Sequence, residues 1–539
     1  MVGARQARRR SVRRFAPFTA AMAVMLLLTF IGADRPGTPV PTNLIGGPYA
    51  RLLADSTDLG PARAARVQLT AALTEGATPV RLTRWAGDHG LSVRWRAGDP
   101  WAVVEGPPDA VAGALDVAVH DYRGKRGQVF YASPQQPVVP EQVSAEVGQL
   151  GRILGYTPYR MGVPPMMPRD VPDGGLLPSE LVTAYNLNPL LDGGFTGKGS
   201  TVVVFAFDGF DQRDLDSFSD WFDLPKFTPQ VVGGMPSQVH GEATMDIQMV
   251  HAIAPDAKIV LANARPTVEG DASYEKIGRL FESVDRQFPG AVWSLSIGWG
   301  CDRLLTTADL IPVRTALVAA LRHGTSAFDA TGDLAGLECR GGKTWADPPS
   351  PDDVGVDAVA SIPEMTGVGG TTLSTDAEGN WLAEQGWYDV PLTQGSGGGV
   401  STLYRRPSWQ VGHEKAGPRD RRLSPDVAAV ADPFTGVKFV FRQQVLVGGG
   451  TSQAAPLWAG FAAVINQYLA SRNLGPLGDL NPQLYEIAQG AVAPAFRDIY
   501  LGANAVTPVH PGYDMITGLG SPNIANLVKD LLVARSVGR

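Results

Sequence analysis

The sequence predicts an α/β fold whose larger domain is a doubly wound parallel sheet. Strand and helix patterns alternate over about 300 residues from position 179 onward, as expected for repeated βα units. Residues 201–207 (TVVVFAF) form a continuous apolar run, which is typical of a strand buried on both faces. In such sheets, functional sites lie at the carboxyl ends of the strands.

The composition excludes several protein classes. The chain has 539 residues, of which 44% are hydrophobic and 18% are charged, so a disordered tail, a coiled coil and a small disulfide scaffold are excluded. The net charge of −7 argues against a nucleic-acid-binding protein, which needs a basic surplus for phosphate contacts. The 63 glycines and 43 prolines show no period, which excludes collagen-like and repeat architectures. A large globular enzyme remains.

Residues 1–33 have the pattern of an export signal. Six arginines precede an uncharged run over residues 15–33, and Gly32-Ala33 offers a cleavage site. The 19-residue run fits either a cleaved signal peptide or an N-terminal membrane anchor that is retained. We therefore expect the bulk of the chain to be secreted, or held at the outer face of the membrane if residues 15–33 are not removed.

Three segments follow before the larger domain. Residues 34–46 are a Pro-rich linker, residues 47–150 are a small α/β domain, and residues 151–178 are a Pro- and Gly-rich connector that suits proteolytic cleavage. In the small domain we expect these elements: a helix at 63–75, strands at 91–95 and 101–105, and a helix at 108–118.

The domain at 179–539 carries the regular alternation. Its expected strands are 201–207, 258–264, 292–296, 325–328 and 437–447. Its expected helices are 242–254, 273–288, 308–322 and 452–470.

Ser452 stands in the strongest local motif, GGGTSQAAP at 448–456. A serine at a strand-to-helix junction sits at the positive end of the helix dipole, which favours a developing oxyanion. The three glycines let a substrate backbone approach closely. The same pattern also fits a simple serine N-cap, so the motif alone leaves both interpretations open.

Glu242 and Asp246 form a second candidate group. Residues four apart share one face of a helix, so the two carboxyls lie side by side, and one of them tends to keep its proton. The same face of the helix continues through apolar residues. Burying a carboxyl on such a face costs free energy, which favours a functional role for the two acids. A solvated acidic pair at a helix start is the alternative.

Other acids and the two cysteines complete the set of candidates. Asp333 lies in a Thr-Gly-Asp turn after a short strand. Asp498 and Asp514, with loop carbonyls between them, offer hard oxygen ligands for calcium, although the spacing is not that of an EF-hand. Cys301 and Cys339 predict one disulfide in an exported protein, with two separate buried thiols as the alternative.

Together, seven ordered stretches resemble the sedolisin family of serine-carboxyl peptidases. They are GEATMDIQMVHAIAPDAKI (241–259), SLSIGWG (294–300), TGD (331–333), GSGGGVSTLYRRPSWQ (395–410), SPDVAAVADPFTG (424–436), GGTSQAAP (449–456) and GYDMITGLGSP (512–522). The resemblance covers residues 179–539. It implies a subtilisin-like catalytic domain, preceded at 47–150 by a ferredoxin-like activation propeptide that inhibits the enzyme intramolecularly.

The resemblance also implies roles for individual residues. Ser452 is the expected nucleophile, Glu242 its general base and acid, Asp246 the holder of a shared proton, and Asp333 the oxyanion-hole acid. The expected calcium ligands are the side chains of Asp498 and Asp514 and the carbonyls of Ile499, His510 and Gly512; His510 departs from the family's usual glycine. We expect a monomeric, self-processed, acid-active endopeptidase that acts on peptides and proteins, binds one structural calcium ion and binds no nucleic acid.

Two alternatives stay open at this stage. A subtilisin-type triad would use Asp208, His240 and Ser452, since Asp208 follows a buried strand and His240-Gly241 resembles a histidine motif. A catalytically silent, membrane-anchored binding protein could keep the same fold. The sequence does not give the peptide specificity, the exact processing bond, or the choice between endopeptidase and tripeptidyl-peptidase action.

Overall fold

A computed structural model describes residues 43–125, 127–156, 160–161, 174–340, 349–389, 394–412, 416–490 and 493–537. The predicted signal or anchor at 1–33, most of the linker at 34–46 and most of the connector at 151–178 lie outside these residues. These described residues belong to one compact unit.

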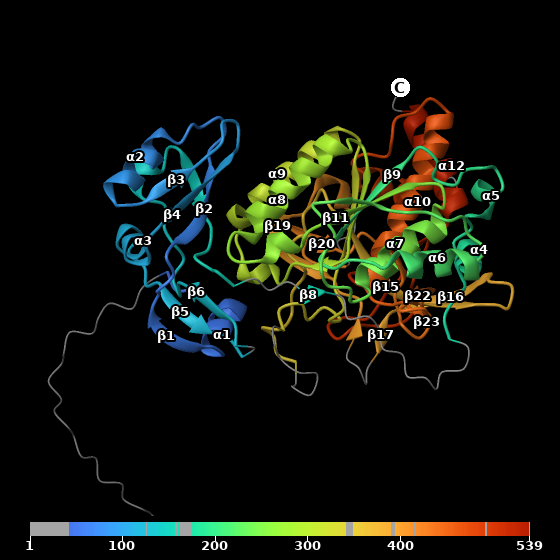
Figure 1. Cartoon of the computed structure of the whole chain (residues 1–539), viewed down its shortest axis with the longest axis horizontal. Helices are drawn as coiled ribbons and strands as arrows, with labels where there is room; N and C mark the ends of the chain where they lie inside the picture. The colour runs from blue at the N-terminus through green and yellow to red at the C-terminus, as the bar shows by residue number, and fades with distance from the viewer. Residues whose placement is uncertain are drawn as a thin grey trace, which may run out of the picture. The chain divides into compact units, whose positions relative to one another are not determined.

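One eight-stranded sheet organises the larger domain (Figure 1). Its order is β10-β11-β9-β12-β14-β15-β16, with β21 also paired to β15. Every pairing is parallel except that of β15 with β16. The strands are β9 (Thr201–Ala206), β10 (Gln230–Val232), β11 (Lys258–Asn263), β12 (Val292–Leu295), β14 (Ser326–Ala330), β15 (Thr366–Thr375), β16 (Trp381–Gly386) and β21 (Val427–Val430).

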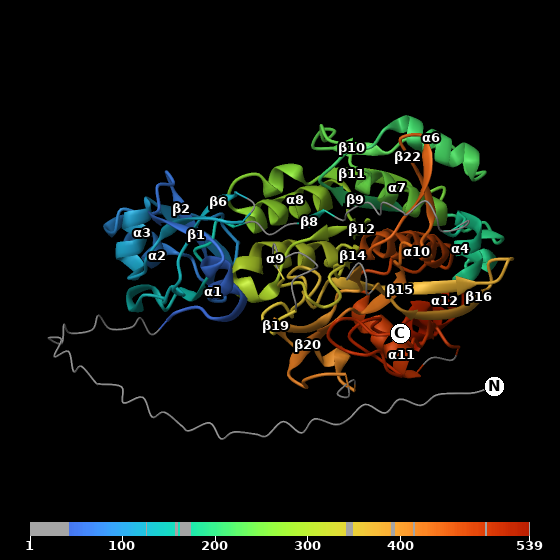
Figure 2. The same cartoon turned by 90° about the horizontal axis from the view of Figure 1, so that it is seen from below.

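Helices cover both faces of this sheet, which confirms the predicted doubly wound α/β class. Val202 and Val204 of β9 pack in one core with α7 (Glu242–Ile253) and α10 (Thr451–Ser471). Val203 and Phe205 face a second core with α8 (Ser273–Gln287) and α9 (Thr307–Arg322). Figures 1 and 2 show α8 beside α9 and α7 beside α10. The alternating burial explains the continuous apolar run at 201–207.

Shorter elements complete the larger domain. Residues 437–447 form a hairpin, β22 (Lys438–Phe441) with β23 (Gln444–Val447), rather than the single strand that we expected. The other helices are α4 (Pro178–Ala184), α5 (Asn188–Leu191), α6 (Gln212–Trp221), α11 (Asn481–Gly490) and α12 (Ile524–Val537). The other strands are β13 (Ile297–Gly298), β17 (Tyr388–Asp389), β18 (Gln394–Gly395), β19 (Gly399–Arg405), β20 (Arg421–Ser424), β24 (Phe496–Arg497) and β25 (Ser521–Pro522).

The N-terminal domain contains an antiparallel sheet of order β3-β4-β2-β7. With α2 after β2 and α3 after β4, this is the β-α-β-β-α-β pattern of a ferredoxin-like domain, with other elements inserted before β7. The elements are α1 (Gly47–Ala54), β1 (Thr57–Pro61), β2 (Val67–Leu73), α2 (Val80–Asp88), β3 (Ser92–Arg94), β4 (Trp101–Gly106), α3 (Pro108–Leu115), β5 (His120–Arg123), β6 (Val129–Ala132) and β7 (Val147–Leu150).

The helix expected at 63–75 was wrong. The segment contains β2, in which Val67, Leu69 and Ala71 are buried while Gln68 and Thr70 are partly exposed. This period of two is that of a strand, and the helix of this region, α2, begins only at Val80.

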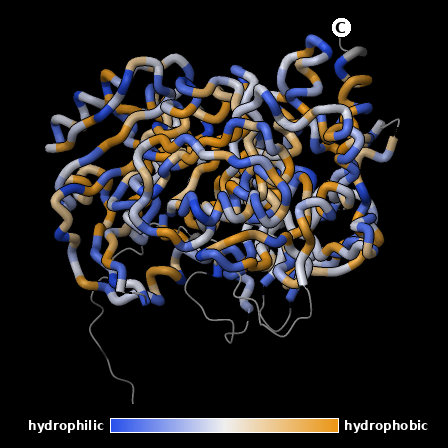
Figure 3. Tube along the Cα trace, turned by 45° about the vertical axis from the view of Figure 1, so that its right-hand side comes forward, coloured by the Kyte–Doolittle hydropathy of each residue, from blue (hydrophilic) through white to orange (hydrophobic). Residues whose placement is uncertain are grey.

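Figure 3 shows hydrophobic stretches of the trace mainly in the interior and hydrophilic stretches at many places on the periphery. Among the described residues, no helix is long and apolar enough to cross a membrane. The 15–33 run, for which an anchor was considered, lies outside them.

Candidate active site

Three neighbouring strands deliver polar side chains to one edge of the sheet. Asp208 follows β9, Ser296 follows β12 and Asp333 follows β14, and these strands are adjacent in the order β9-β12-β14. Because the carboxyl ends of parallel strands meet at the same edge, the three residues gather there. Helices α7 and α10 begin at this edge with Glu242 and Ser452 in their first turns.

Asp208 fixes the start of α7. Its Oδ2 accepts hydrogen bonds from the backbone N–H groups of His240 (2.8 Å) and Gly241 (3.0 Å), and its Oδ1 accepts one from Ala243 (3.0 Å). Burial raises the pKa of Asp208, and the three backbone donors oppose that shift. The side chain therefore holds the helix terminus that carries Glu242.

Glu242 and Asp246 are both buried, one helical turn apart on α7. Burial raises the pKa of Glu242 to about 8, the neighbouring Ser452 hydroxyl opposes that rise, and the charges of Asp208 and Asp333 add to it. Burial and the neighbouring Glu242 raise the pKa of Asp246 well above its usual range. No ion pair among the described residues includes either carboxyl, so a proton takes the place of a cation.

Ser296 joins this group, although the sequence analysis gave it no role. Its hydroxyl lies 3.0 Å from Asp246 Oδ1 and 2.9 Å from the carbonyl oxygen of Ser452. The SLSIGWG stretch was noted only for its resemblance, and the signal that could have singled out Ser296 is a serine directly after a buried strand.

Thr451 positions Asp333. Asp333 Oδ1 accepts hydrogen bonds from the Thr451 N–H (2.7 Å) and hydroxyl (2.9 Å), and the Thr451 hydroxyl in turn accepts one from the Gly332 N–H (3.0 Å). Gly450 has a φ of +81°, and a Cβ there would lie 2.7 Å from Asp333 Oδ2. A glycine is therefore required between Asp333 and the start of α10.

The structure does not form the Asp208–His240 pair of the subtilisin-type alternative. The His240 ring is exposed, and its Nε2 lies 3.0 Å from Gln238 Oε1. Asp208 binds the backbone of His240, not its imidazole. A general base on His240 needs an orienting carboxylate on its ring, and none of the described residues supplies one.

The calcium candidates lie in the loops between β24 and β25. Both Asp498 oxygens accept from the Gly512 N–H at 3.0 Å, which ties the two predicted ligand segments together. The buried Asp514 accepts bonds from Ile516, Thr517 and the Thr517 hydroxyl, and burial raises its pKa to about 6. Among the described residues, no hydrogen bond ends on the carbonyl oxygens of Ile499, His510 or Gly512. Oxygen donors of this kind fit calcium.

Cys301 and Cys339 are bonded as a disulfide, with Cα atoms 4.7 Å apart. Of the two interpretations of the cysteines, the structure thus has the bridge. The bridge lies beside the buried Asp302, but bonded sulfurs do not act as thiolate ligands, so this cluster is no metal centre.

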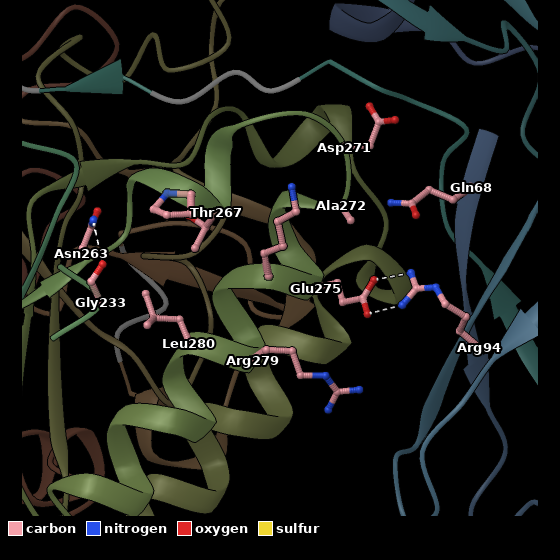
Figure 4. Close-up of a pocket in the computed structure, with 12 residues that line it drawn as sticks. Gln68, Arg94, Gly233, Asn263, Thr267, Asp271, Ala272, Glu275, Arg279 and Leu280 are labelled. Atoms are coloured by element: carbon pink, nitrogen blue, oxygen red, sulfur yellow. Dashed lines mark hydrogen bonds and ion pairs between the residues drawn. The ribbon is translucent and has the colours of Figure 1, made fainter. Parts of the chain in front are cut away.

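A cavity of about 720 Å³ lies away from these residues, between the N-terminal domain and α8 (Figure 4). Gln68 and Arg94 line it from one side, and Asn263, Asp271 and Glu275 from the other. The Arg94 guanidinium makes two 2.8 Å hydrogen bonds to Glu275 across it. The cavity is therefore part of the seam between the domains, not a catalytic pocket.

Comparison with known proteins gives relatives of one kind. Kumamolisin from Bacillus sp. (strain MN-32) is 30% identical over 495 residues, which cover 84% of this chain and 83% of kumamolisin. Sedolisin from Pseudomonas sp. (strain 101) is 26% identical over 78% of this chain and 73% of its own length, and tripeptidyl-peptidase 1 from Bos taurus is 26% identical over 77% and 75%. No family model matches the sequence.

A solved structure agrees with these relatives. The structure of Pseudomonas sedolisin, described as a serine-carboxyl proteinase complexed with two molecules of pseudo-iodotyrostatin, matches with a TM-score of 0.55 and 25% identity. The match covers 68% of this chain and 99% of that one.

Proposed function

The chain belongs to the sedolisin family of serine-carboxyl peptidases, and we propose that it is an acid-active secreted endopeptidase made as a self-processed zymogen. The observation that carries the proposal is the pair of buried carboxyls of Glu242 and Asp246, which lie one helical turn apart without a cationic partner among the described residues. The Ser452 hydroxyl acts on the pKa of Glu242 from the first turn of α10.

In the proposed reaction Ser452 Oγ attacks the peptide carbonyl carbon while its proton passes to Glu242. The carbonyl oxygen becomes an oxyanion, which Asp333 stabilises by donating a hydrogen bond from its protonated carboxyl, aided by the N-terminus of α10. Glu242 then returns the proton to the leaving amine, and the C–N bond breaks to give an acyl-enzyme on Ser452. A water molecule, deprotonated by Glu242, hydrolyses that ester and regenerates the serine.

Acid activity follows from the protons that this scheme needs. The pair of Glu242 and Asp246 must hold one proton, and Asp333 must be protonated to donate. Burial without a cation raises the pKa of both members of the pair, so the singly protonated pair persists at acidic and mildly acidic pH. Activity should therefore fall as the pH rises and the pair loses its proton.

The N-terminal domain is proposed to be the propeptide. Its β2, β4 and β7 pack on α9, and the backbone N–H of Arg152 donates to the buried Asp309 of α9 at 3.0 Å. Arg51 reaches into the larger domain, with its guanidinium 2.6 Å from the buried Asp353 and 2.7 Å from the Ser350 hydroxyl. These contacts support an inhibitor that docks specifically on its own enzyme.

The connector is proposed to be the first substrate. Its strand β8 (Arg160–Met161) pairs antiparallel with β13, where Met161 lies opposite Ile297 and Arg160 opposite Gly298. This edge directly follows Ser296 of the active site, so the connector adds a strand there as an extended peptide substrate would. The processing bond itself, predicted between residues 150 and 178, lies in a stretch that is mostly outside the described residues.

One structural calcium ion is also part of the proposal. Asp498, Asp514 and the carbonyls of Ile499, His510 and Gly512 would hold it and thereby tie the loops between β24 and β25 together. A chelator should lower the Tm of the enzyme, and calcium but not magnesium should restore it. Retention at the membrane is not part of the proposal.

The test is intact mass and peptidase activity of the 34–539 protein after incubation at about pH 4 and pH 7, with Ser452→Ala as the matched control. Loss of about 15 kDa at acidic pH only, and only with Ser452, supports the proposal. This expectation is the share of the 57.1 kDa of the 539-residue chain that lies between position 34 and the end of the connector. Processing at neutral pH, or no cleavage of a denatured protein at either pH, contradicts it. Cleavage of an N-terminally blocked peptide separates endopeptidase from tripeptidyl-peptidase action.

A further inference from the structure

The Ser296 hydroxyl lies between two groups that can each accept a hydrogen bond from its single proton. Its Oγ lies 3.0 Å from Asp246 Oδ1 and 2.9 Å from the carbonyl oxygen of Ser452, and all three residues are buried. A serine hydroxyl has one hydrogen to donate and two lone pairs that accept. It can donate to only one of these two neighbours at a time.

Pro456 decides which neighbour needs that hydrogen. In an α-helix the N–H of residue i donates to the carbonyl of residue i−4, so residue 456 would normally serve the carbonyl of Ser452. Pro456 lies inside α10 and has no N–H. The Ser452 carbonyl is buried and only accepts, so the Ser296 hydroxyl is the donor that replaces the missing one.

The contact between Ser296 and Asp246 must then run in the opposite direction. With its hydrogen on the Ser452 carbonyl, Ser296 Oγ can only accept from Asp246, which requires a proton on Asp246 Oδ1. We propose that Ser296 is a positioning residue that keeps the proton of the carboxyl pair on Asp246 and so leaves Glu242 as the base for Ser452. This inference rests on the proposed function, because it assigns the proton within the same catalytic pair.

The surroundings of Asp246 agree with this assignment. The titratable groups that face it are Glu242 on its own helix and Asp208 after β9, and both are acids. Asp208 is engaged by three backbone N–H groups, so it does not compete for the proton. Among the described residues, no cationic side chain forms an ion pair with Asp246.

Loss of the proton changes the network. When Asp246 is ionised, its carboxylate accepts the hydrogen bond from the Ser296 hydroxyl, and the Ser452 carbonyl then loses its donor. Ser296 and Pro456 together therefore make ionisation of Asp246 more costly than it would be in a regular helix. The network thus keeps the proton on Asp246, and leaves Glu242 as the base, up to a higher pH.

Pro456→Ala tests this directly. The new N–H at 456 serves the Ser452 carbonyl, which frees Ser296 to donate to an ionised Asp246. The alkaline limb of the kcat/KM–pH profile should then move down by about 0.5–1 pH unit, because a donor to the charged form lowers a carboxyl's pKa. In the Ser296→Ala background the same Pro456→Ala change should not move that limb, because the hydroxyl is gone.

Two further readouts separate this role from a merely structural one. Ser296→Ala should lower kcat with KM little changed and lower the Tm, and Pro456→Ala should restore the Tm but not kcat in that background. Pro312→Ala, which removes the other proline inside a long helix, α9, is the control and should leave the pH profile unchanged.

Two results would overturn the assignment: Pro456→Ala shifts the alkaline limb equally with and without the Ser296→Ala change, or it shifts the limb in neither case. Wild-type protein without peptidase activity at any pH would instead refute the proposed function. In that case the Tm values of the single and double variants still report whether Ser296 donates to the Ser452 carbonyl. An unchanged Tm in Ser296→Ala would contradict that hydrogen bond.

Discussion

Buried acids occur in two regions of this protein, and their partners differ. At the Ser452 site, Glu242 and Asp246 are buried without a cation, and their pKa values rise. At the seam between the domains, Asp99 and Glu105 are equally buried but are paired with arginines.

The seam arginines connect acids of the two domains. Arg94 contacts Glu105 and Glu275, and Arg96 contacts Asp99 and Glu282. Their carboxylate partners, Glu275 for Arg94 and Glu282 for Arg96 above all, hold the pKa of both guanidiniums above the ordinary value. The comparison teaches that burial alone does not set the charge of a carboxyl: where a guanidinium is present an ion pair forms, and where none is present a proton is kept.

The largest expected effect comes from removing Glu242, the proposed general base at the Ser452 site. Glu242→Gln keeps the shape but cannot accept the Ser452 proton, so kcat should fall about 10³-fold or more while KM changes little. Steady-state kinetics at acidic pH check this. Glu269→Gln, a change of an exposed acid that pairs with Arg265, is the matched control. Retained activity in the Glu242 variant would remove this carboxyl from the mechanism.

The unpaired acids should also make stability depend on pH. Burial raises the pKa of Glu242 from 4.5 to about 8 and raises that of Asp246 as well, so over this range the folded carboxyl pair holds a proton that the unfolded chain has released. This contribution is fully present below about pH 4.5 and is lost as the pH rises through 8. Tm measured from pH 5 to 8 in the Ser452→Ala protein, which cannot digest itself, should fall more steeply than in Ser452→Ala with Glu242→Gln.

At the seam between the domains, Arg94→Ala together with Arg96→Ala should weaken the binding of the N-terminal domain to the larger domain. Each partly exposed pair contributes about 1 kcal/mol or less, so retention of the processed fragment should weaken about 5- to 30-fold. Co-elution of the fragment with the enzyme at pH 7 measures this. Arg66→Ala removes a pair with Glu105 inside the N-terminal domain and serves as the control. Equal loss in both variants would mean that the domain itself had been destabilised.

The smallest expected effect is that of His240→Ala. The ring is exposed and contacts only Gln238 through its side chain among the described residues, so kcat/KM should change less than about twofold, as for an ordinary surface substitution. A loss of activity comparable to that of Glu242→Gln would support the Asp208–His240 alternative and would contradict the difference drawn between the two regions.

Local pattern was sufficient to predict much of the larger domain. Periodicity and the positions of glycines predict the strand at 201–207, the helices at 242–254 and 452–470, and the alternation between them; the structure has these helices at Glu242–Ile253 and Thr451–Ser471. The spacing of Glu242 and Asp246 is likewise local, because four residues always make one helical turn. The ordered motifs also identified the family, which the relatives then showed.

Local pattern was weakest where strands are short and antiparallel. Residues 63–75 were mistaken for a helix because their alternation is interrupted: Ala71 and Ala72 are both buried in β2. The hairpin at 438–447 was taken as one strand because its turn, at Arg442 and Gln443, contains no glycine or proline; both residues have positive φ instead.

The sequence by itself determined the fold class, the family, the acidic pair on one helical turn, and the serine at the start of a helix. Only the tertiary structure decided which groups those residues meet. Ser296 is 50 residues from Asp246 and 156 from Ser452, and it joins them because β12 lies between β9 and β14 in the sheet. The same packing gives the Asp208 carboxyl to the backbone of α7 rather than to the His240 ring. Periodicity acts over a few residues, whereas the order of strands brings together residues that no local pattern relates.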